Sequence, residues 1–208
     1  MRMTEPIADP EQELEAIGPL IPLLFEAFEA ATERACQFFE PNSPVDSCLF
    51  PELVRYFMKG TLADKVEVVQ DFEREAVGHN GLSVIFRGRR IRMWKAHDDE
   101  LPPAGSSRAK RGFLNQQLAL FLSETGDSQL VHLNLVILWN VSSSYRLRRL
   151  YLACPKSANG TWVPAESWWT REIQHPAAAA LPGESSASPD MPDLPFERTD
   201  IESDAQQA

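Results

Sequence analysis

A run of alternating side chains from Leu130 to Val141 constrains the fold more than any other feature of this chain. One set of alternate positions is apolar throughout and the other is partly apolar: Val131, Leu133, Leu135, Ile137, Trp139 and Val141 in the first, and Leu130, Val136 and Leu138 in the second. Because successive strand residues point to opposite faces, such a run must be covered on both sides. We expect a central strand, with Leu147 to Cys154 returning beside it after the turn at Ser142 to Ser144.

A second alternating region extends from Leu82 to Lys95 and predicts a β-hairpin with Gly88 and Arg89 as its two-residue turn. This turn gives the following pairs on one face: Phe86 with Ile91 and Val84 with Met93. The other face then carries Ile85, Trp94 and three arginines: Arg87, Arg90 and Arg92. The same register places Arg87 opposite Arg90, which destabilises a strand pair unless an anion lies nearby.

The first 45 residues predict a helical part. Asp9, Pro10 and Glu11 form a typical helix start, with an N-cap carboxylate and a proline in the first turn. A glycine and two prolines should interrupt this helix: Gly18, Pro19 and Pro22. A second helix, reaching about Glu40, is expected to pack by an apolar face: Leu24, Phe28, Ala31, Ala35 and Phe38.

Further elements are expected between and after these segments. Phe50 and Pro51 begin a short helix that Gly60 should end as a C-terminal cap. Residues 61–75 give conflicting signals and favour a helix followed by a strand. Residues 108–122 predict a helix that is basic in its first turn, and residues 160–169 predict an edge element.

Together these elements predict an α+β protein: N-terminal helices, then two β-hairpins separated by a helix and forming a mostly antiparallel sheet. Residues 1–175 are expected to form a single domain, with residues 1–45 as its N-terminal helical part. Residues 176–208 are rich in Pro, Ala, Ser and acidic residues, which predicts a disordered acidic tail.

The charges are distributed unevenly along a chain whose net charge is −10. Residues 1–50 contain ten acidic and two basic residues, whereas residues 87–149 contain eleven basic and five acidic ones. The net charge argues against a dedicated nucleic-acid-binding protein, which needs cations to displace counterions from phosphates. The odd number of widely spaced cysteines, Cys36, Cys48 and Cys154, indicates free thiols and a cytoplasmic location. No segment has the pattern of a signal peptide or membrane span, so no membrane association is expected.

No pattern in the sequence is typical of a catalytic, metal-binding or cofactor-binding site, and we expect no cofactor and no bound metal. The densest group of potential ligands, His97 to Glu100, consists of adjacent loop residues, which rarely converge on one ion. His79, His132 and His175 are isolated in the sequence. The favoured interpretation is therefore not an enzyme. A metal-dependent hydrolase or nuclease that uses His97 and nearby acids is an alternative.

The hairpin and the helix after it supply a candidate binding patch: Arg87, Arg90, Arg92, Trp94, Lys95, Arg108, Lys110 and Arg111. Arginine combined with an aromatic side chain is suited to holding phosphates and stacking bases. The same charges can also receive an acidic protein surface. The structural interpretation is a solvated sheet face balanced by the chain's own acids between Glu11 and Glu33.

Three tryptophans, Trp162, Trp168 and Trp169, lie in a polar segment near the end of the predicted domain. Their structural interpretation is a lid over the core. Their functional interpretation is an exposed anchor for a protein partner, a role in which tryptophan is favoured.

These observations favour binding over chemistry. We expect a non-enzymatic interaction or regulatory protein with a protein partner, in its sharpest form a bacterial antitoxin or immunity-type protein that neutralises that partner. The predicted tail is expected to fold onto the partner. Single-stranded nucleic-acid binding through the basic hairpin is the main alternative.

Overall fold

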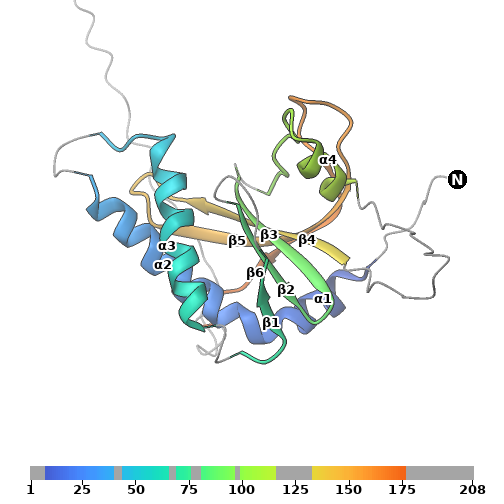
Figure 1. The fold of residues 1–208 in the computed structure, drawn as a ribbon, viewed down its shortest axis with the longest axis horizontal. Coiled ribbons are helices and arrows are strands. Elements are labelled where there is room, and N and C mark those ends of the chain that lie inside the picture. The colour runs from blue at the N-terminus through green and yellow to red at the C-terminus, as the bar shows by residue number, and fades with distance from the viewer. Residues whose placement is uncertain are drawn as a thin grey trace, which may run out of the picture.

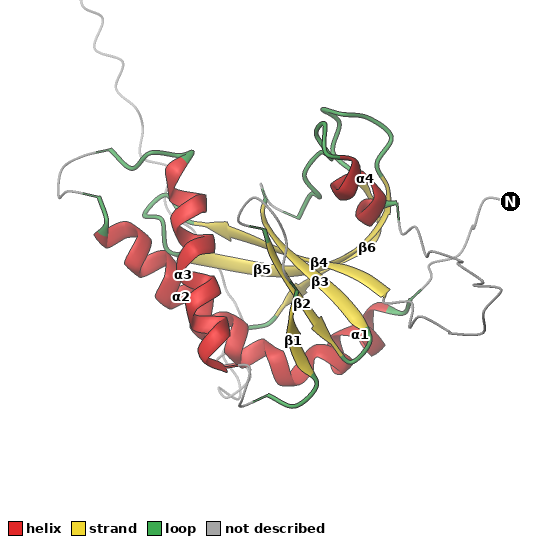
Figure 2. Cartoon of the chain, in the orientation of Figure 1, coloured by secondary structure: helices red, strands yellow, loops and turns green. Residues whose placement is uncertain are grey.

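The computed structural model describes residues 8–39, 44–65, 69–75, 81–96, 99–115 and 133–176 (Figure 1). Within them the chain forms an α+β fold with a six-stranded sheet (Figure 2). The helices are α1 (Pro10–Ile17), the 3₁₀-helix η1 (Gly18–Leu20), α2 (Ile21–Gln37), α3 (Leu49–Lys65) and α4 (Arg108–Leu114). The strands are β1 (Phe72–Arg74), β2 (Leu82–Phe86), β3 (Arg89–Lys95), β4 (Leu133–Val141), β5 (Leu147–Ser157) and β6 (Glu166–Ile173).

The strands follow one another across the sheet in chain order, from β1 at one edge to β6 at the other. All neighbouring strands are antiparallel except β3 and β4, which are parallel. A parallel pair needs a crossover of about a dozen residues or more, and the segment that contains α4 supplies it. The predicted pair of hairpins separated by a helix is therefore confirmed, and each hairpin has one additional edge strand.

The two faces of the sheet are covered differently. Helices α1, α2 and α3 cover one face (Figure 2), where Phe28 of α2 packs against Trp139 of β4 with ring centroids 5.7 Å apart. On the other face, Phe113 of α4 belongs to a second apolar cluster with Val136 and Leu138 of β4. All three β4 side chains are fully buried. The expected central strand with two apolar faces is thereby confirmed.

The N-terminal helices begin and break where the sequence predicts. The Asp9 carboxylate accepts hydrogen bonds of 3.0 Å from the backbone N–H groups of Glu11 and Gln12. The 3₁₀ turn η1 then separates α1 from α2, because Pro19 and Pro22 lack the backbone donors that a continuous helix needs.

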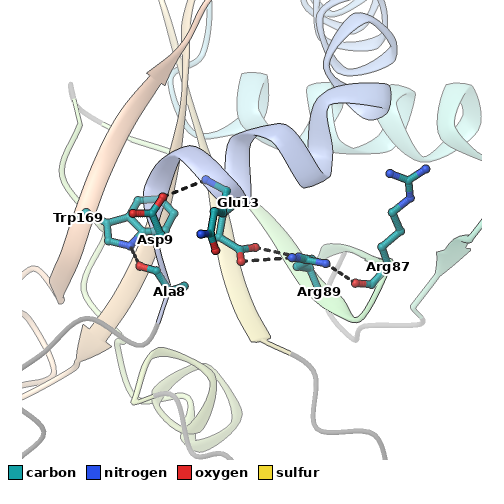
Figure 3. Close-up of polar contacts among 7 residues, drawn as sticks. Ala8, Asp9, Glu13, Arg87, Arg89 and Trp169 are labelled. Carbon is teal, nitrogen blue, oxygen red and sulfur yellow. Dashed lines mark hydrogen bonds and ion pairs between the residues drawn. The ribbon is translucent and has the colours of Figure 1, made fainter.

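Two contacts fix α1 to the sheet (Figure 3). Glu13 is only 7% exposed and accepts two hydrogen bonds from Arg89 of β3, of 2.8 Å from Nε and 3.2 Å from Nη2. The Trp169 indole N–H donates to the backbone oxygen of Ala8 at 2.8 Å. Helix α1 is therefore attached to β3 and to β6, two strands that are not neighbours in the sheet.

Helix α3 is longer than predicted. The expectation that Gly60 ends this helix is wrong, because α3 continues to Lys65. Val54, Met58 and Leu62 are buried at four-residue steps on both sides of the glycine. Their packing outweighs the cost of a glycine in a helix interior, which is about 0.5–1 kcal/mol relative to alanine.

The register of the β2–β3 hairpin differs from its prediction by two residues. The structure pairs Phe86 with Arg89, so the turn is formed by Arg87 and Gly88 instead of Gly88 and Arg89. Both turn residues have positive φ, 46° for Arg87 and 76° for Gly88. This combination is typical of a type I′ turn, whose twist fits a two-residue hairpin.

The two-residue shift leaves each side chain on its predicted face, because side chains alternate along a strand with a period of two. The predicted opposition of Arg87 and Arg90 is wrong, since Ile85 lies opposite Arg90. The hairpin therefore contains no pair of opposed arginines that would require an anion.

Other element ends also differ from expectation. Helix α4 ends at Leu114, and the rest of the predicted helix, residues 116–122, lies outside the described residues. The edge strand β6 begins at Glu166, not near residue 160. Strand β5 continues past Cys154 through Pro155, where its pairing with β6 is irregular. Such irregularities are where a sheet accepts proline. The predicted tail lies outside the described residues from residue 177 onward.

Candidate binding surface

Two arginines of the β2–β3 hairpin are paired with acids that flank β1. Arg87 Nε lies 3.8 Å from a carboxylate oxygen of Asp71. Arg90 Nε lies 2.9 Å from a carboxylate oxygen of Glu75, whose other oxygen accepts a 2.6 Å hydrogen bond from the Ser83 hydroxyl. These positive charges are therefore neutralised within the fold.

The acids of the N-terminal helices balance the hairpin only in part. Glu13 pairs with Arg89, a residue that the sequence assigned to the turn rather than to the binding patch. Glu11 and Glu33 pair instead with arginines outside the hairpin, Arg171 at 3.9 Å and Arg146 at 3.6 Å. Among the described residues, only one ion pair therefore joins the acids of residues 11–33 to the hairpin, so the expected charge compensation is confirmed only in part.

In the second half of β3, cationic side chains lie against aromatic rings. Arg92 Cζ lies 4.4 Å from the centroid of the Phe113 ring, and Lys110 Nζ lies 4.8 Å from the centroid of the Trp94 ring. The Trp94 and Phe113 rings meet edge to face, with centroids 5.6 Å apart. The Lys110 ammonium also donates to the backbone oxygen of Pro103 at 2.8 Å. Three predicted patch residues, Arg92, Trp94 and Lys110, are thus brought together.

These cations are partly removed from water. Burial lowers the pKa of Arg92, and the nearby Glu75 carboxylate opposes this effect in part. Burial also lowers the pKa of Lys110, and the nearby charges of Arg55 and Arg92 lower it further. Arg55 on α3 forms an ion pair with Glu52. In the described part of the chain, the Nε atoms of Arg55 and Arg92 are buried without a hydrogen-bond partner. The arrangement therefore concentrates positive charge in a partly desolvated part of the surface.

A pocket of about 350 Å³ lies at the end of β3, between the start of α3 and the loop that precedes α4. Its lining is rich in proline and includes two charged residues: Ser47, Pro51, Lys95, Ala96, Glu100, Leu101, Pro102, Pro103 and Pro164. Pro103 accepts the hydrogen bond from Lys110, and Pro51 lies one helical turn before Arg55 on α3. Burial lowers the pKa of Lys95 in the pocket wall. The pocket therefore combines apolar walls with one cation, Lys95, and one carboxylate, Glu100.

The three tryptophans have different environments. Trp169 is 7% exposed and belongs to the core, and Trp168 packs partly buried against it with Lys156 Nζ 5.1 Å from its ring centroid. Trp162 is 82% exposed, and its neighbour Val163 is 59% exposed. The interpretation as a core lid is confirmed for Trp169, whereas Trp162 is the exposed tryptophan.

The loop that carries Trp162 is fixed beside the pocket. The backbone N–H of Gly105 donates to the backbone oxygen of Thr161 at 2.9 Å, and Leu101 forms an isolated antiparallel bridge with Ala165. The pocket lining joins the start of α3, through Pro51, to the loop before α4, through Pro102 and Pro103. We call this region the α3–α4 surface: the proline-rich pocket together with Arg55, Arg92, Trp94, Lys110, Trp162 and Val163.

The other predicted patch residues do not join Arg92, Trp94 and Lys110, although Lys95 belongs to the α3–α4 surface through the pocket lining. Arg87 is in the hairpin turn, at the other end of β3. Arg108 and Arg111 are exposed on α4, and Arg111 Nη2 donates to the backbone oxygen of Gly105 at 3.4 Å. Lys95 lies on the opposite face of β3 from Arg92 and reaches the pocket there, with Nζ 6.0 Å from the centroid of the Phe50 ring.

The predicted cluster of potential metal ligands falls partly outside the described residues, which exclude His97 and Asp98 as well as His79 and His132. Asp99 and Glu100 are exposed. His175 Nε2 lies 3.2 Å from a carboxylate oxygen of Glu29. In the segments that the structure describes, no group of three His, Cys, Asp or Glu side chains is arranged to hold a metal ion.

All three cysteines are free thiols, as the sequence predicts. Burial, with a smaller contribution from Glu13, raises the pKa of Cys154 to about 12. Burial also raises the pKa of Cys36.

Sequence reasoning missed two parts of the α3–α4 surface. Arg55 was not among the predicted patch residues, which were sought in the hairpin and the helix after it. In the structure Arg55 lies close enough to Lys110 to lower its pKa. Pro102 and Pro103 were not among the predicted patch residues, although they line the pocket. The proline pair was the one available signal, because adjacent prolines make a rigid and partly apolar wall.

Comparison with protein-family models, with curated proteins and with solved structures finds no match for this chain. None of the described helices has the length and apolar character that crossing a membrane requires. The function is therefore argued from the geometry of the surface.

Proposed function

We propose that this protein is a non-enzymatic interaction protein that binds a partner protein through the α3–α4 surface. The observation that carries the proposal is Trp162, whose side chain is 82% exposed beside an apolar pocket. Tryptophan is enriched among residues that dominate binding energy. Exposed apolar surface rimmed by charge is typical of protein-interaction sites.

The charges of the surface select an acidic partner. Among the described residues, no carboxylate forms an ion pair with Arg92, Lys95 or Lys110. A partner carboxylate would supply the missing negative charge, while an apolar side chain beside it would enter the pocket. We therefore expect a docking segment that combines Asp or Glu with one bulky apolar residue.

The geometry supports a protein over a nucleic acid. One face of the Trp94 ring is covered by Lys110 and one face of the Phe113 ring by Arg92, which leaves less ring surface for stacked bases. The net charge of −10 also opposes a long polyanion. Nucleic-acid binding would instead predict an oligonucleotide affinity that falls steeply with salt and is reduced by Arg90→Ala or Arg92→Ala.

The sharpest form of the proposal is neutralisation of the partner, as an antitoxin or immunity-type protein achieves by binding alone. It predicts that co-expression of this protein suppresses the partner's activity, and that Trp162→Ala restores that activity. Suppression that persists with Trp162→Ala would place the neutralising contact elsewhere on the molecule.

Affinity capture from the native host at low salt tests the binding proposal. The wild-type protein should retain a partner, and Trp162→Ala should retain at least about ten-fold less of it, the effect of removing a single strong anchor residue. Phe38→Ala is the matched control, because Phe38 is also a large exposed aromatic residue, 63% exposed near the end of α2. Equal capture by the two variants, with unchanged thermal unfolding, would contradict the proposal.

A further inference from the structure

A second concave surface lies between α2, α3 and the edge strand β1. It is a groove of about 480 Å³, within the range of about 300–1,000 Å³ that is usual for small-molecule sites. The residues that define its chemistry are Arg34, Tyr56, Phe57, Lys59, Gly60 and Arg74. None of the described residues that line it is a carboxylate. The groove is therefore cationic in a protein that is acidic as a whole.

Two guanidinium groups from separate elements line this groove. Arg34 of α2 lies over the Phe57 ring, with Cζ 4.7 Å from the ring centroid. Arg74 of β1 donates from Nη1 to the backbone oxygen of Lys59 at 3.2 Å. In the described part of the chain, neither arginine forms an ion pair with a carboxylate. The planar donor fork of arginine is well suited to phosphate.

The groove also offers an exposed ring. Tyr56 is 64% exposed and meets Phe57 edge to face, with ring centroids 5.5 Å apart. A planar group can therefore stack on Tyr56 without displacing a core side chain, and stacking of this kind accepts any base.

Gly60 is in the interior of α3, where a glycine lowers helix stability. A Cβ atom at this position would meet no atom within 4 Å, so packing does not explain the glycine. Because Gly60 lines the groove, the absence of a side chain keeps the groove open.

We propose that this groove binds a nucleoside phosphate, with the phosphate between Arg34 and Arg74 and the base against Tyr56. The size of the groove fits a mononucleotide. The net charge of −10 disfavours a nucleic-acid strand, whose many phosphates would extend beyond the local cations. This site is separate from the α3–α4 surface and does not depend on the proposed partner.

Equilibrium dialysis with AMP and GMP tests the site. Adenosine, which lacks the phosphate, and inorganic phosphate, which lacks the base, are the control ligands. The nucleotides should bind at least about ten-fold more tightly than adenosine or phosphate alone, because only they use both the arginines and the ring. Higher salt should weaken nucleotide binding, since two ionic contacts contribute to it.

Three variants in the groove and one control variant outside it test whether the nucleotide binds there. Arg34→Gln and Arg74→Gln should each weaken AMP binding about ten-fold, the effect of losing a charge-assisted hydrogen bond. Arg171→Gln removes the same charge from β6, at the opposite edge of the sheet, and should leave AMP binding unchanged. Gly60→Leu should abolish binding by filling the groove while retaining the thermal stability of the wild type, because leucine favours the helix.

Three results of the binding measurements with the wild-type protein would overturn this proposal. They are no AMP or GMP binding below about 1 mM, binding of adenosine equal to that of AMP, and binding of oligonucleotides without mononucleotides. A loss with Arg171→Gln equal to that with Arg34→Gln would also overturn it. Trp162→Ala should leave AMP binding intact, so failure at one surface is distinguishable from failure at the other.

Discussion

The two halves of strand β3 carry similar positive charge but face different groups. In the first half, Arg89 faces Glu13 and Arg90 faces Glu75. In the second half, Arg92 lies over the Phe113 ring and Lys95 lies near the Phe50 ring. A single basic run in the sequence thus contains charges that hold the fold together and charges that form no ion pair among the described residues.

The difference originates in the elements that pack against each half. Helix α1 and the residues that flank β1 bring carboxylates to the start of β3 and its turn. Helix α4, in the crossover between β3 and β4, brings Phe113 and one additional cation, Lys110, to the other half. The number of charges in a segment therefore does not identify a binding surface, whereas the partner of each charge does.

The largest expected effect is on the structural half. Arg89→Ala should lower the free energy of unfolding by about 3–5 kcal/mol, because it leaves the buried Glu13 carboxylate without its partner. Chemical denaturation of the variant and the wild type measures this difference. A loss below about 1 kcal/mol, the range of an exposed ion pair, would show that the pair is not structural.

Replacing both members of this pair provides the control. The double variant Glu13→Gln with Arg89→Met should recover most of the lost stability, because it removes the unpaired buried charge. If the double variant is as unstable as Arg89→Ala, the loss arises from packing rather than from the charge.

A smaller effect is expected at Arg90, which is also in the structural half but is partly exposed. Its Nε atom lies 2.9 Å from Glu75 but is not directed at it as a hydrogen-bond donor. Arg90→Gln should therefore lower the free energy of unfolding by only about 0.2–1 kcal/mol, as for other exposed pairs. The same denaturation experiment tests this value. A loss as large as that of Arg89→Ala would remove the distinction between the two ion pairs.

The smallest effect concerns pH and the half of β3 that faces rings. Burial and nearby cations lower the folded-state pKa of Lys110 below its ordinary value of 10.5. Between these two pKa values the unfolded chain binds more protons than the folded chain, so the free energy of unfolding should rise as pH increases through this interval. In Lys110→Met, which keeps an apolar chain over Trp94, this part of the rise should disappear. Parallel stability curves for the two proteins would contradict the electrostatic description.

Much of the sheet was predictable because alternation has a direct physical consequence. In β4 the two sets of alternate side chains enter different apolar clusters, with Trp139 in one and Leu138 in the other. The β2–β3 hairpin was predicted on the correct faces but in the wrong register. Its turn begins at Arg87, and arginine is not among the residues that usually mark a positive φ.

The helix end and the parallel strand pair depend on tertiary packing, which a local pattern does not contain. Gly60 has the local signature of a helix end, but Met58 and Leu62 are buried on either side of it. Strands β3 and β4 are far apart in the sequence, and no residue in either strand indicates that they pair in parallel.

The candidate surface was predictable only in part. Arg92, Trp94 and Lys110 were selected because they are basic or aromatic and near one another in the sequence. They differ from Arg87 and Arg90 in ion pairing, because Asp71 and Glu75 pair with those two arginines. The local sequence does not show which acids reach the sheet. Trp162 and Trp169 have the same side chain, and only the position of β6 makes one exposed and the other buried.

The most direct test compares partner binding by Arg90→Gln and Arg92→Gln, two variants that remove the same charge from one face of one strand. Arg92→Gln should weaken binding of the captured partner by about ten-fold, because its charge is available to a partner carboxylate. Arg90→Gln should leave that affinity within about two-fold of the wild type, because Glu75 already neutralises this arginine. Equal losses in the two variants, or a loss confined to Arg90→Gln, would contradict the division of β3 into a structural half and a binding half.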